Sequence, residues 1–185
     1  MSDVIIRNPI TGDGVSTTGS GTDVHLLVEA IDIDFIAHAS DEDELAFVWV
    51  STTYNYCAAD TILLVQNTSS TLDLFIHKAT WHGDTASTIT FHTTDGTTLT
   101  PAGTVITGIN LNRKSGKSAA ADARRDETAN TQGNVIGSFK VEVNKWDDWD
   151  FDDTVILGNG DSLAADIVTD GGAAVVAFYG FYKEA

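Results

Sequence analysis

Three histidines close together in the chain are the first residues whose chemistry could be functional, because imidazole is a common metal ligand. His77, His82 and His92 fall in a segment expected to form neighbouring strands, on which His77 and His92 could face each other. Metal-bound histidines are usually oriented by a carboxylate, and the surrounding Trp81, Gly83 and Thr residues offer no obvious partner of that kind. A cupin-type enzyme needs several His and a Glu at fixed positions on adjacent strands, and no H-x-H or His-acid pattern of that sort is present. We therefore expect ordinary polar residues here, not a metal site.

Two acidic clusters offer the hard oxygen ligands that calcium prefers, ASDEDEL and KWDDWDFDDT. Neither has the D-x-D-x-D-G spacing of an EF-hand loop. The weak calcium candidates of the second cluster are Asp148, Asp150 and Asp152. In an extended strand these three would share one face, while Trp149 and Phe151 would occupy the other. An edge strand with solvated carboxylates explains this pattern without a metal, so we expect no cofactor and keep calcium as the alternative.

The sequence contains no motif for covalent catalysis. A G-x-S-x-G nucleophile elbow and a Walker-type phosphate loop are both absent. Cys57, the single cysteine, has no activating neighbour or second thiol, so we expect a small buried hydrophobic side chain there. Asp32 and Asp34 would share a strand face, but carboxylates at this spacing are too common to indicate a catalytic pair. We predict that the chain is not an enzyme and has no catalytic residues.

Tryptophans are the candidate residues for glycan binding, because exposed indoles on β-sandwiches stack on sugar rings. The four are Trp49, Trp81, Trp146 and Trp149. Most tryptophans in sandwiches belong to the core, so the exposure of Trp146 and Trp149 decides this possibility.

A basic segment stands out in a strongly acidic chain of 185 residues with net charge −17. It contains half of the ten basic residues, namely Arg113, Lys114, Lys117, Arg124 and Arg125. These belong to a long segment without strand character, residues 113–133, whose only helix propensity lies around 118–128. One interpretation is a solvated loop; the other is a docking element for an acidic surface on a partner or a neighbouring subunit.

The remaining sequence predicts an all-β protein, an antiparallel sandwich of about 8–11 strands, because Thr, Val and Ile abound and short apolar runs alternate with turn residues. We expect strands at residues 3–7, 24–33, 46–53, 61–66, 72–80, 87–93, 105–110, 135–143, 154–157, 163–168 and 174–182. Within 72–79, Leu72, Leu74, Ile76 and Lys78 should face opposite to Asp73, Phe75, His77 and Ala79. In the 87–93 strand, Ile89 and Phe91 should share one face and His92 the other. The continuous apolar runs ELAFVWV, TILLVQ and AAVVAFYGF suit strands in the middle of the sandwich or at a subunit interface.

Composition limits the class of protein further. With 42% hydrophobic and 20% charged residues the chain is too apolar for disorder, and its apolar runs are too short for a membrane helix. Its negative charge opposes binding to nucleic acids and anionic membranes. The start, MSDVIIRNP, has no secretory-signal pattern, so we expect synthesis in the cytoplasm. We divide the chain into a strand and flexible Gly/Thr/Ser-rich arm at 1–22 and one sandwich domain at 23–185.

Three segments, LFIHKATWHGDTASTITFHTTDGTTLTPAG, NLNRKSGKSAAADARRDETANTQGN and ILGNGDSLAADIVTDGGAAVVAFYGFY, carry a family resemblance over residues 60–182. Their Thr-rich hairpins, G-D-S-L turn and aromatic last strand resemble the jelly-roll head decoration (cement) proteins of tailed bacteriophages. The resemblance implies a homotrimer that binds the major capsid protein on the virion exterior and stabilises the lattice.

The same resemblance assigns roles to parts of the chain. It makes VVAFYGFY, with Phe178, Tyr179 and Phe181, an intersubunit strand, the N-terminal segment a capsid-gripping arm, and the basic segment an electrostatic anchor. The alternatives are a phage tail or baseplate appendage, a glycan-binding sandwich, a calcium-dependent adhesin-like module and a jelly-roll enzyme.

Overall fold

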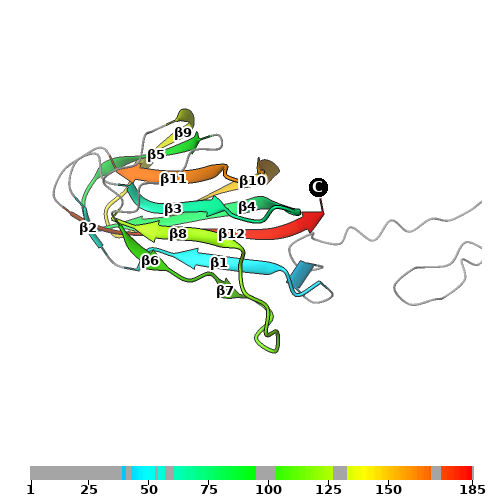
Figure 1. Ribbon diagram of the computed structural model, residues 1–185. Coiled ribbons are helices and arrows are strands. Elements are labelled where there is room, and N and C mark those ends of the chain that lie inside the picture. Colours follow the sequence, from blue (N-terminus) through cyan, green and yellow to red (C-terminus); the bar gives the residue numbers. More distant parts are fainter. Residues whose placement is uncertain are drawn as a thin grey trace, which may run out of the picture. The chain divides into compact units, whose positions relative to one another are not determined.

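Two antiparallel β-sheets packed face to face make up the part of the chain that the structure describes (Figure 1). This computed structural model describes residues 39–40, 43–52, 54–56, 61–94, 103–126, 133–167 and 172–184. The predicted all-β sandwich is confirmed. The arm expected at 1–22 and the strands expected at 3–7 and 24–33 lie outside the described residues.

The first sheet takes its six strands from both halves of the chain. They are β1 (Ala46–Val50), β2 (Tyr54–Tyr56), β4 (Leu72–Gly83), β7 (Ile109–Asn110), β10 (Trp146–Leu157) and β12 (Gly172–Glu184). Their order is β10-β4-β12-β1-β7, and β2 pairs with the start of β12. The last strand of the chain therefore lies inside the sheet, between β4 and β1.

The second sheet also has six strands. They are β3 (Thr61–Asn67), β5 (Ser87–Thr94), β6 (Thr104–Ile106), β8 (Ala121–Arg125), β9 (Asn134–Val141) and β11 (Ser162–Ile167), in the order β6-β8-β3-β11-β5-β9. From β3 to β5, and again from β9 to β12, successive strands belong to alternate sheets. Each connection thus crosses between the layers, and the apolar faces of successive strands meet in the space between them.

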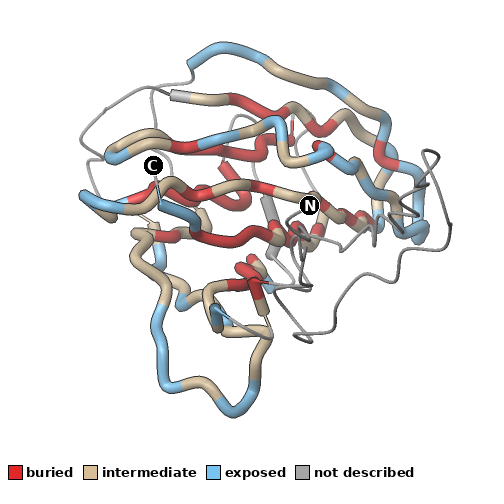
Figure 2. The backbone as a smooth tube through the Cα atoms, turned by 90° about the vertical axis from the view of Figure 1, so that its right-hand side faces the viewer, coloured by how far each residue is buried: buried red, intermediate tan, exposed pale blue. Residues whose placement is uncertain are grey.

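Aromatic side chains fill that space. The ring of Phe91 in β5 lies 5.5 Å from Trp81, 5.6 Å from Trp149 and 6.1 Å from Phe178, measured between centroids. Figure 2 shows buried residues running along the inner strands while an exposed loop projects below them. The three continuous apolar runs became β1, β3 and β12, each with a hydrogen-bonded strand on both sides, so the mid-sandwich interpretation of these runs is confirmed.

The alternation predicted for β4 is correct only as far as Ile76. Leu74 and Ile76 are buried as expected, but Ala79 is also buried in the core and Lys78 faces outward, the reverse of the prediction. The reason is a β-bulge: Lys78 and Ile76 pair with consecutive residues of β12, so His77 has no register partner there. One extra residue turns every following side chain to the opposite face. In β5, by contrast, Ile89 and Phe91 share the core face as predicted.

Four segments differ from the sequence-based expectations. β10 begins at Trp146, not at residue 154, and the strand expected at 105–110 divides into β6 and β7. Strand β2 was not predicted, and the helix propensity around 118–128 was misleading because Ala121–Arg125 form strand β8, paired with β3 and β6. Pairing with two strands outweighs an intrinsic preference worth a few tenths of a kcal/mol per residue. Among the described residues, no helix is long and apolar enough to cross a membrane.

Candidate binding surfaces

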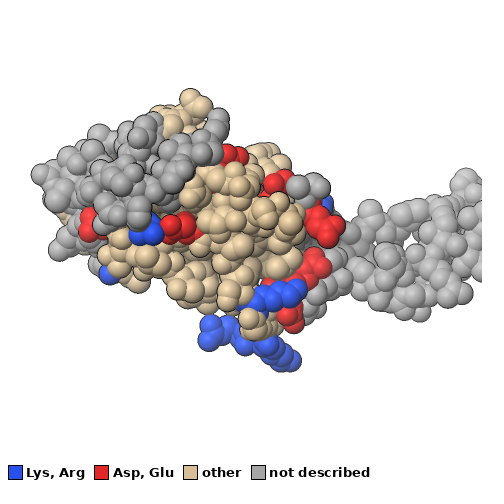
Figure 3. Space-filling view, in the orientation of Figure 1, with Lys and Arg blue, Asp and Glu red and all other residues tan. Residues whose placement is uncertain are grey.

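The connection between β7 and β8 carries three of the five basic residues. Arg113, Lys114 and Lys117 are exposed, and we call them the basic tip. Their loop projects from the body in Figure 2, and its Lys and Arg atoms stand out at the lower edge of Figure 3. Side chains order it locally: Asn112 Oδ1 accepts a hydrogen bond from Lys114 N at 3.0 Å, and Ser115 Oγ accepts one from Lys117 N at 3.0 Å. The tip is therefore a turn-rich loop that presents positive charge to solvent.

Arg124 and Arg125 lie at the other end of β8 and are occupied within the fold. Arg124 forms an ion pair with Asp122 at 3.0 Å. Arg125 donates hydrogen bonds to Ser51 O at 3.3 Å and to Thr52 Oγ1. The predicted five-residue cluster is thus divided into a projecting group and a pair that ties β8 to its surroundings.

Two of the three aromatic residues of β12 that were expected at a subunit interface are buried inside this chain. Phe178 is fully buried between the sheets, and Phe181 is 3% exposed and stacks on Phe75 at 5.3 Å. Tyr179 is half-buried on the outer face, opposite Lys78 in register. Since β12 already pairs with β4 and β1, its backbone has no free edge for another chain. The expectation that these aromatic residues bind a partner is corrected accordingly for Phe178 and Phe181.

The acidic cluster of the second half forms the outer face of β10. Among the described strands, β10 pairs only with β4, so it is an edge of the first sheet. Asp148 forms an ion pair with Lys78 at 2.8 Å, and this hydrogen bond raises the pKa of Lys78 above its usual value. Asp150 Oδ1 accepts a hydrogen bond from the backbone N–H of Asp152 at 2.9 Å. The solvated acidic edge expected from the sequence describes this surface.

The three calcium candidates are not assembled into a metal site. Asp152 and Asp153 both have positive φ, 49° and 56°, where the register of β10 shifts against the β4 bulge. This backbone turns Asp153 toward His77, whose Nδ1 lies 2.9 Å from Asp153 Oδ1. Within the described ranges, no three His, Cys, Asp or Glu side chains are grouped so as to hold a metal ion.

Histidine and aspartate also meet in the second sheet, where sequence reasoning found no site. His92 Nε2 lies 3.0 Å from Asp166 Oδ2, and their side chains are only 6% and 3% exposed. The two residues are far apart in the chain and meet because β5 pairs with β11, so local spacing gave no signal. The other ring nitrogen of His92 has no hydrogen-bond partner among the described residues, so the pair does not extend to a hydroxyl or thiol nucleophile there.

Three of the four tryptophans contact the core and one, Trp146, is exposed. Trp49 and Trp81 are buried, and Trp149 packs partly buried against the core. Trp146 is 60% exposed, and its ring lies 5.1 Å from that of His82, its register partner on β4. Trp149 therefore has no free face on which a sugar ring could stack, whereas the indole of Trp146 is accessible to a glycan.

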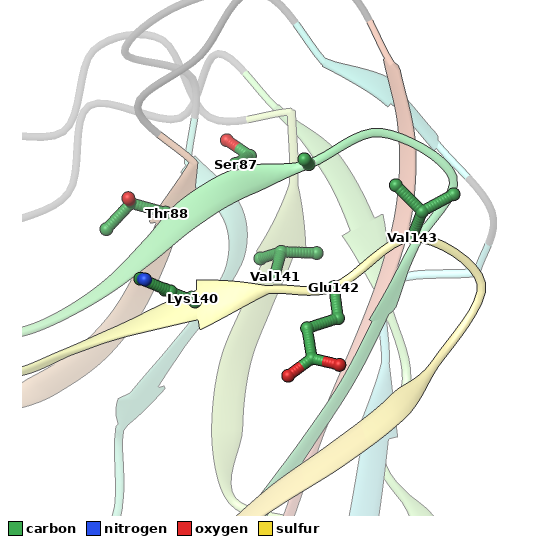
Figure 4. A pocket seen from close by; sticks show the side chains of 7 residues that line it. Ser87, Thr88, Lys140, Val141, Glu142 and Val143 are labelled. Atoms are coloured by element: carbon green, nitrogen blue, oxygen red, sulfur yellow. The ribbon is translucent and has the colours of Figure 1, made fainter.

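A shallow hollow of about 520 Å³ lies between the ends of β5 and β9 (Figure 4). Its lining residues are Ala86, Ser87, Thr88, Lys140, Val141, Glu142 and Val143. The Ser87 hydroxyl and the Glu142 carboxylate point to opposite sides of Val141 in Figure 4. The Ser87 hydroxyl and the Glu142 carboxylate therefore do not face each other across the hollow.

Comparison with known proteins adds no relative: no family model, curated protein or solved structure matches the chain.

Proposed function

We propose that this protein is a virion structural protein that binds the outer surface of a phage capsid and stabilises the lattice. In this role the partners are the major capsid protein and further copies of the chain in a homotrimer, and no catalytic site or cofactor is needed. The observation that carries the proposal is the basic tip, a projecting positive group on a chain of net charge −17.

Charge complementarity supports an acidic surface as the partner of the basic tip. A body with 27 acidic and ten basic residues repels other acidic surfaces at long range. Three exposed cations on a projecting loop allow one defined point of approach to such a surface. The Lys117 ammonium also donates a hydrogen bond to Asp43 O at 2.6 Å, which ties the loop to the body. Charged contacts of this kind fix orientation and partner choice more than affinity.

The strand order supports the jelly-roll part of the proposal. Strands β10-β4-β12-β1 of one sheet face β3-β11-β5-β9 of the other, and these eight strands alternate between the layers along the chain apart from the step from β5 to β9. Two four-stranded sheets joined by such crossings are the arrangement of jelly rolls, which viral capsid proteins, lectins and cupins use. The basic tip belongs to the excursion between β5 and β9 and so can vary without disturbing this framework.

Co-sedimentation with capsids of the encoding virus that lack this protein tests the proposal. We expect saturable binding at lattice stoichiometry that weakens with salt, and greater thermal stability of the capsid. The variant R113Q/K114Q/K117Q should lose attachment and much of its salt dependence while remaining folded.

The matched control is K140Q/K145Q/K183Q, which removes three positive charges from elsewhere on the described surface. It should bind as the unmodified protein does. Equal weakening in both variants would show that net charge and not the basic tip governs attachment, and absence of binding by the folded protein would refute the capsid role.

A further inference from the structure

We propose that the outer face of β10 and β4 is a binding site for neutral glycans, with Trp146 as its stacking platform. The indole is 60% exposed, although the other three tryptophans all contact the core. An exposed indole leaves a large apolar face in water, and the C–H groups on one face of a pyranose ring cover such a face without requiring a cavity. This site is separate from the basic tip and does not depend on the capsid role.

The platform is held by rigid elements. Trp146 pairs in register with His82, and His82 pairs with Val175 of β12, so these residues form one row across three strands. The two rings lie 5.1 Å apart with 38° between their planes, which supports the indole from one side and leaves its other surface to solvent. Sites on sheets hold a ligand more precisely than sites on loops.

Polar groups lie in the next rows of the same face, beside the indole. Asp148 pairs in register with Thr80, and Asp150 with Lys78. The rise of two strand residues, about 7 Å, separates Trp146 from Asp148, so a second sugar ring would lie over Thr80 and Asp148. The Lys78–Asp148 ion pair at 2.8 Å offers charged donors and acceptors to vicinal hydroxyls.

Charge and shape define the ligand class. The carboxylates of Asp148 and Asp150 lie on this face, and the nearby Lys78 is already engaged by Asp148. Sialic acids and uronic acids would meet repulsion here, whereas uncharged hexose chains would not. The face is an open sheet surface, which suits an extended oligosaccharide and not a small metabolite.

The position of the site leaves both surfaces usable at once. Trp146 lies on β10 at one edge of the first sheet, and the basic tip follows β7 at the other edge. A protein attached through the tip would therefore still present the Trp146 face, and a glycan would not compete with an acidic protein partner.

Isothermal titration with neutral tetrasaccharides tests the site, using β-linked and α-linked glucose, galactose, mannose and N-acetylglucosamine chains, with sialyllactose as the anionic probe. We expect saturable binding of at least one neutral probe with a Kd no weaker than about 1 mM, and none of sialyllactose. W146A should reduce the affinity at least tenfold, W146F should retain part of it, and D148N should weaken it.

The matched control is I156A, which removes another half-exposed apolar side chain from the same strand, beyond the register shift. It should bind as the unmodified protein does. Equal binding by W146A would overturn the proposal, as would absence of heat with every neutral probe. A concentration-dependent dimer that W146A abolishes, without any sugar binding, would reassign the face to self-association and also overturn it.

Discussion

The buried pair of His92 and Asp166 allows a quantitative test of how the second sheet is built. Replacing His92 with Leu would leave the Asp166 carboxylate in a site where it is 3% exposed, without the imidazole 3.0 Å away. Removing one partner of a buried pair typically costs about 3–5 kcal/mol, because the remaining charge keeps its desolvation penalty and loses the attraction of that partner. We expect H92L to lower the free energy of unfolding by this amount, since neither side chain is exposed enough for solvent screening to reduce it.

Urea unfolding followed by tryptophan fluorescence measures the effect. With an m-value of about 2–3 kcal/mol/M, a loss of about 3–5 kcal/mol moves the midpoint down by roughly 1–2.5 M. The double variant H92L/D166V replaces both partners by apolar groups and should cost less than the two single variants together. A midpoint shift below about 0.3 M for H92L would refute the reasoning, because it would mean that water reaches the carboxylate.

Two further predictions concern strand β12. F178A should lower the free energy of unfolding by about 3–5 kcal/mol because this side chain fills the core, whereas Y179A on the outer face should cost at most about 1 kcal/mol; thermal denaturation compares them. Burial raises the pKa of Tyr182, so the unfolded chain ionises first and the folded state loses stability as the pH rises above about 10. Y182F should therefore move alkaline unfolding to higher pH in circular dichroism, and an unchanged transition would contradict this assignment.

Strand positions were predictable from sequence where a segment is continuously apolar or alternates clearly between apolar and polar residues. Residues 61–66 and 87–93 carry clear patterns and became β3 and β5 almost unchanged. The acidic first half of β10 was left outside the strand expected at 154–157, although the alternation of its residues indicated an edge strand. Its outward Asp side chains have low strand propensity, and only the inward Trp149 and Phe151 fix it to the core. Burial of Trp149 and Phe151 therefore outweighed the low strand propensity of the Asp residues.

Bulges and long-range pairs were the features that the sequence could not reveal. The bulge at His77 changes which face Lys78 and Ala79 occupy, yet no local residue marks it, because it depends on the register with β12 and β10. The same holds for the pairs that His77 and His92 form with aspartates, whose partners are chosen by strand pairing. Of the candidate site, the exposed charges of the basic tip were predictable, and the burial of Phe178 was not.

The outer edge of the first sheet also limits how the protein can associate. An unpaired edge strand invites pairing with another chain unless charge or irregular backbone prevents it. β10 has both protections: Asp148 and Asp150 lie along its outer face, and the positive φ values of Asp152 and Asp153 interrupt its middle. Backbone addition at β10 is therefore disfavoured, and β12 has no free edge. Contacts through projecting side chains, such as Trp146, are the mode of binding that the β10 edge leaves open.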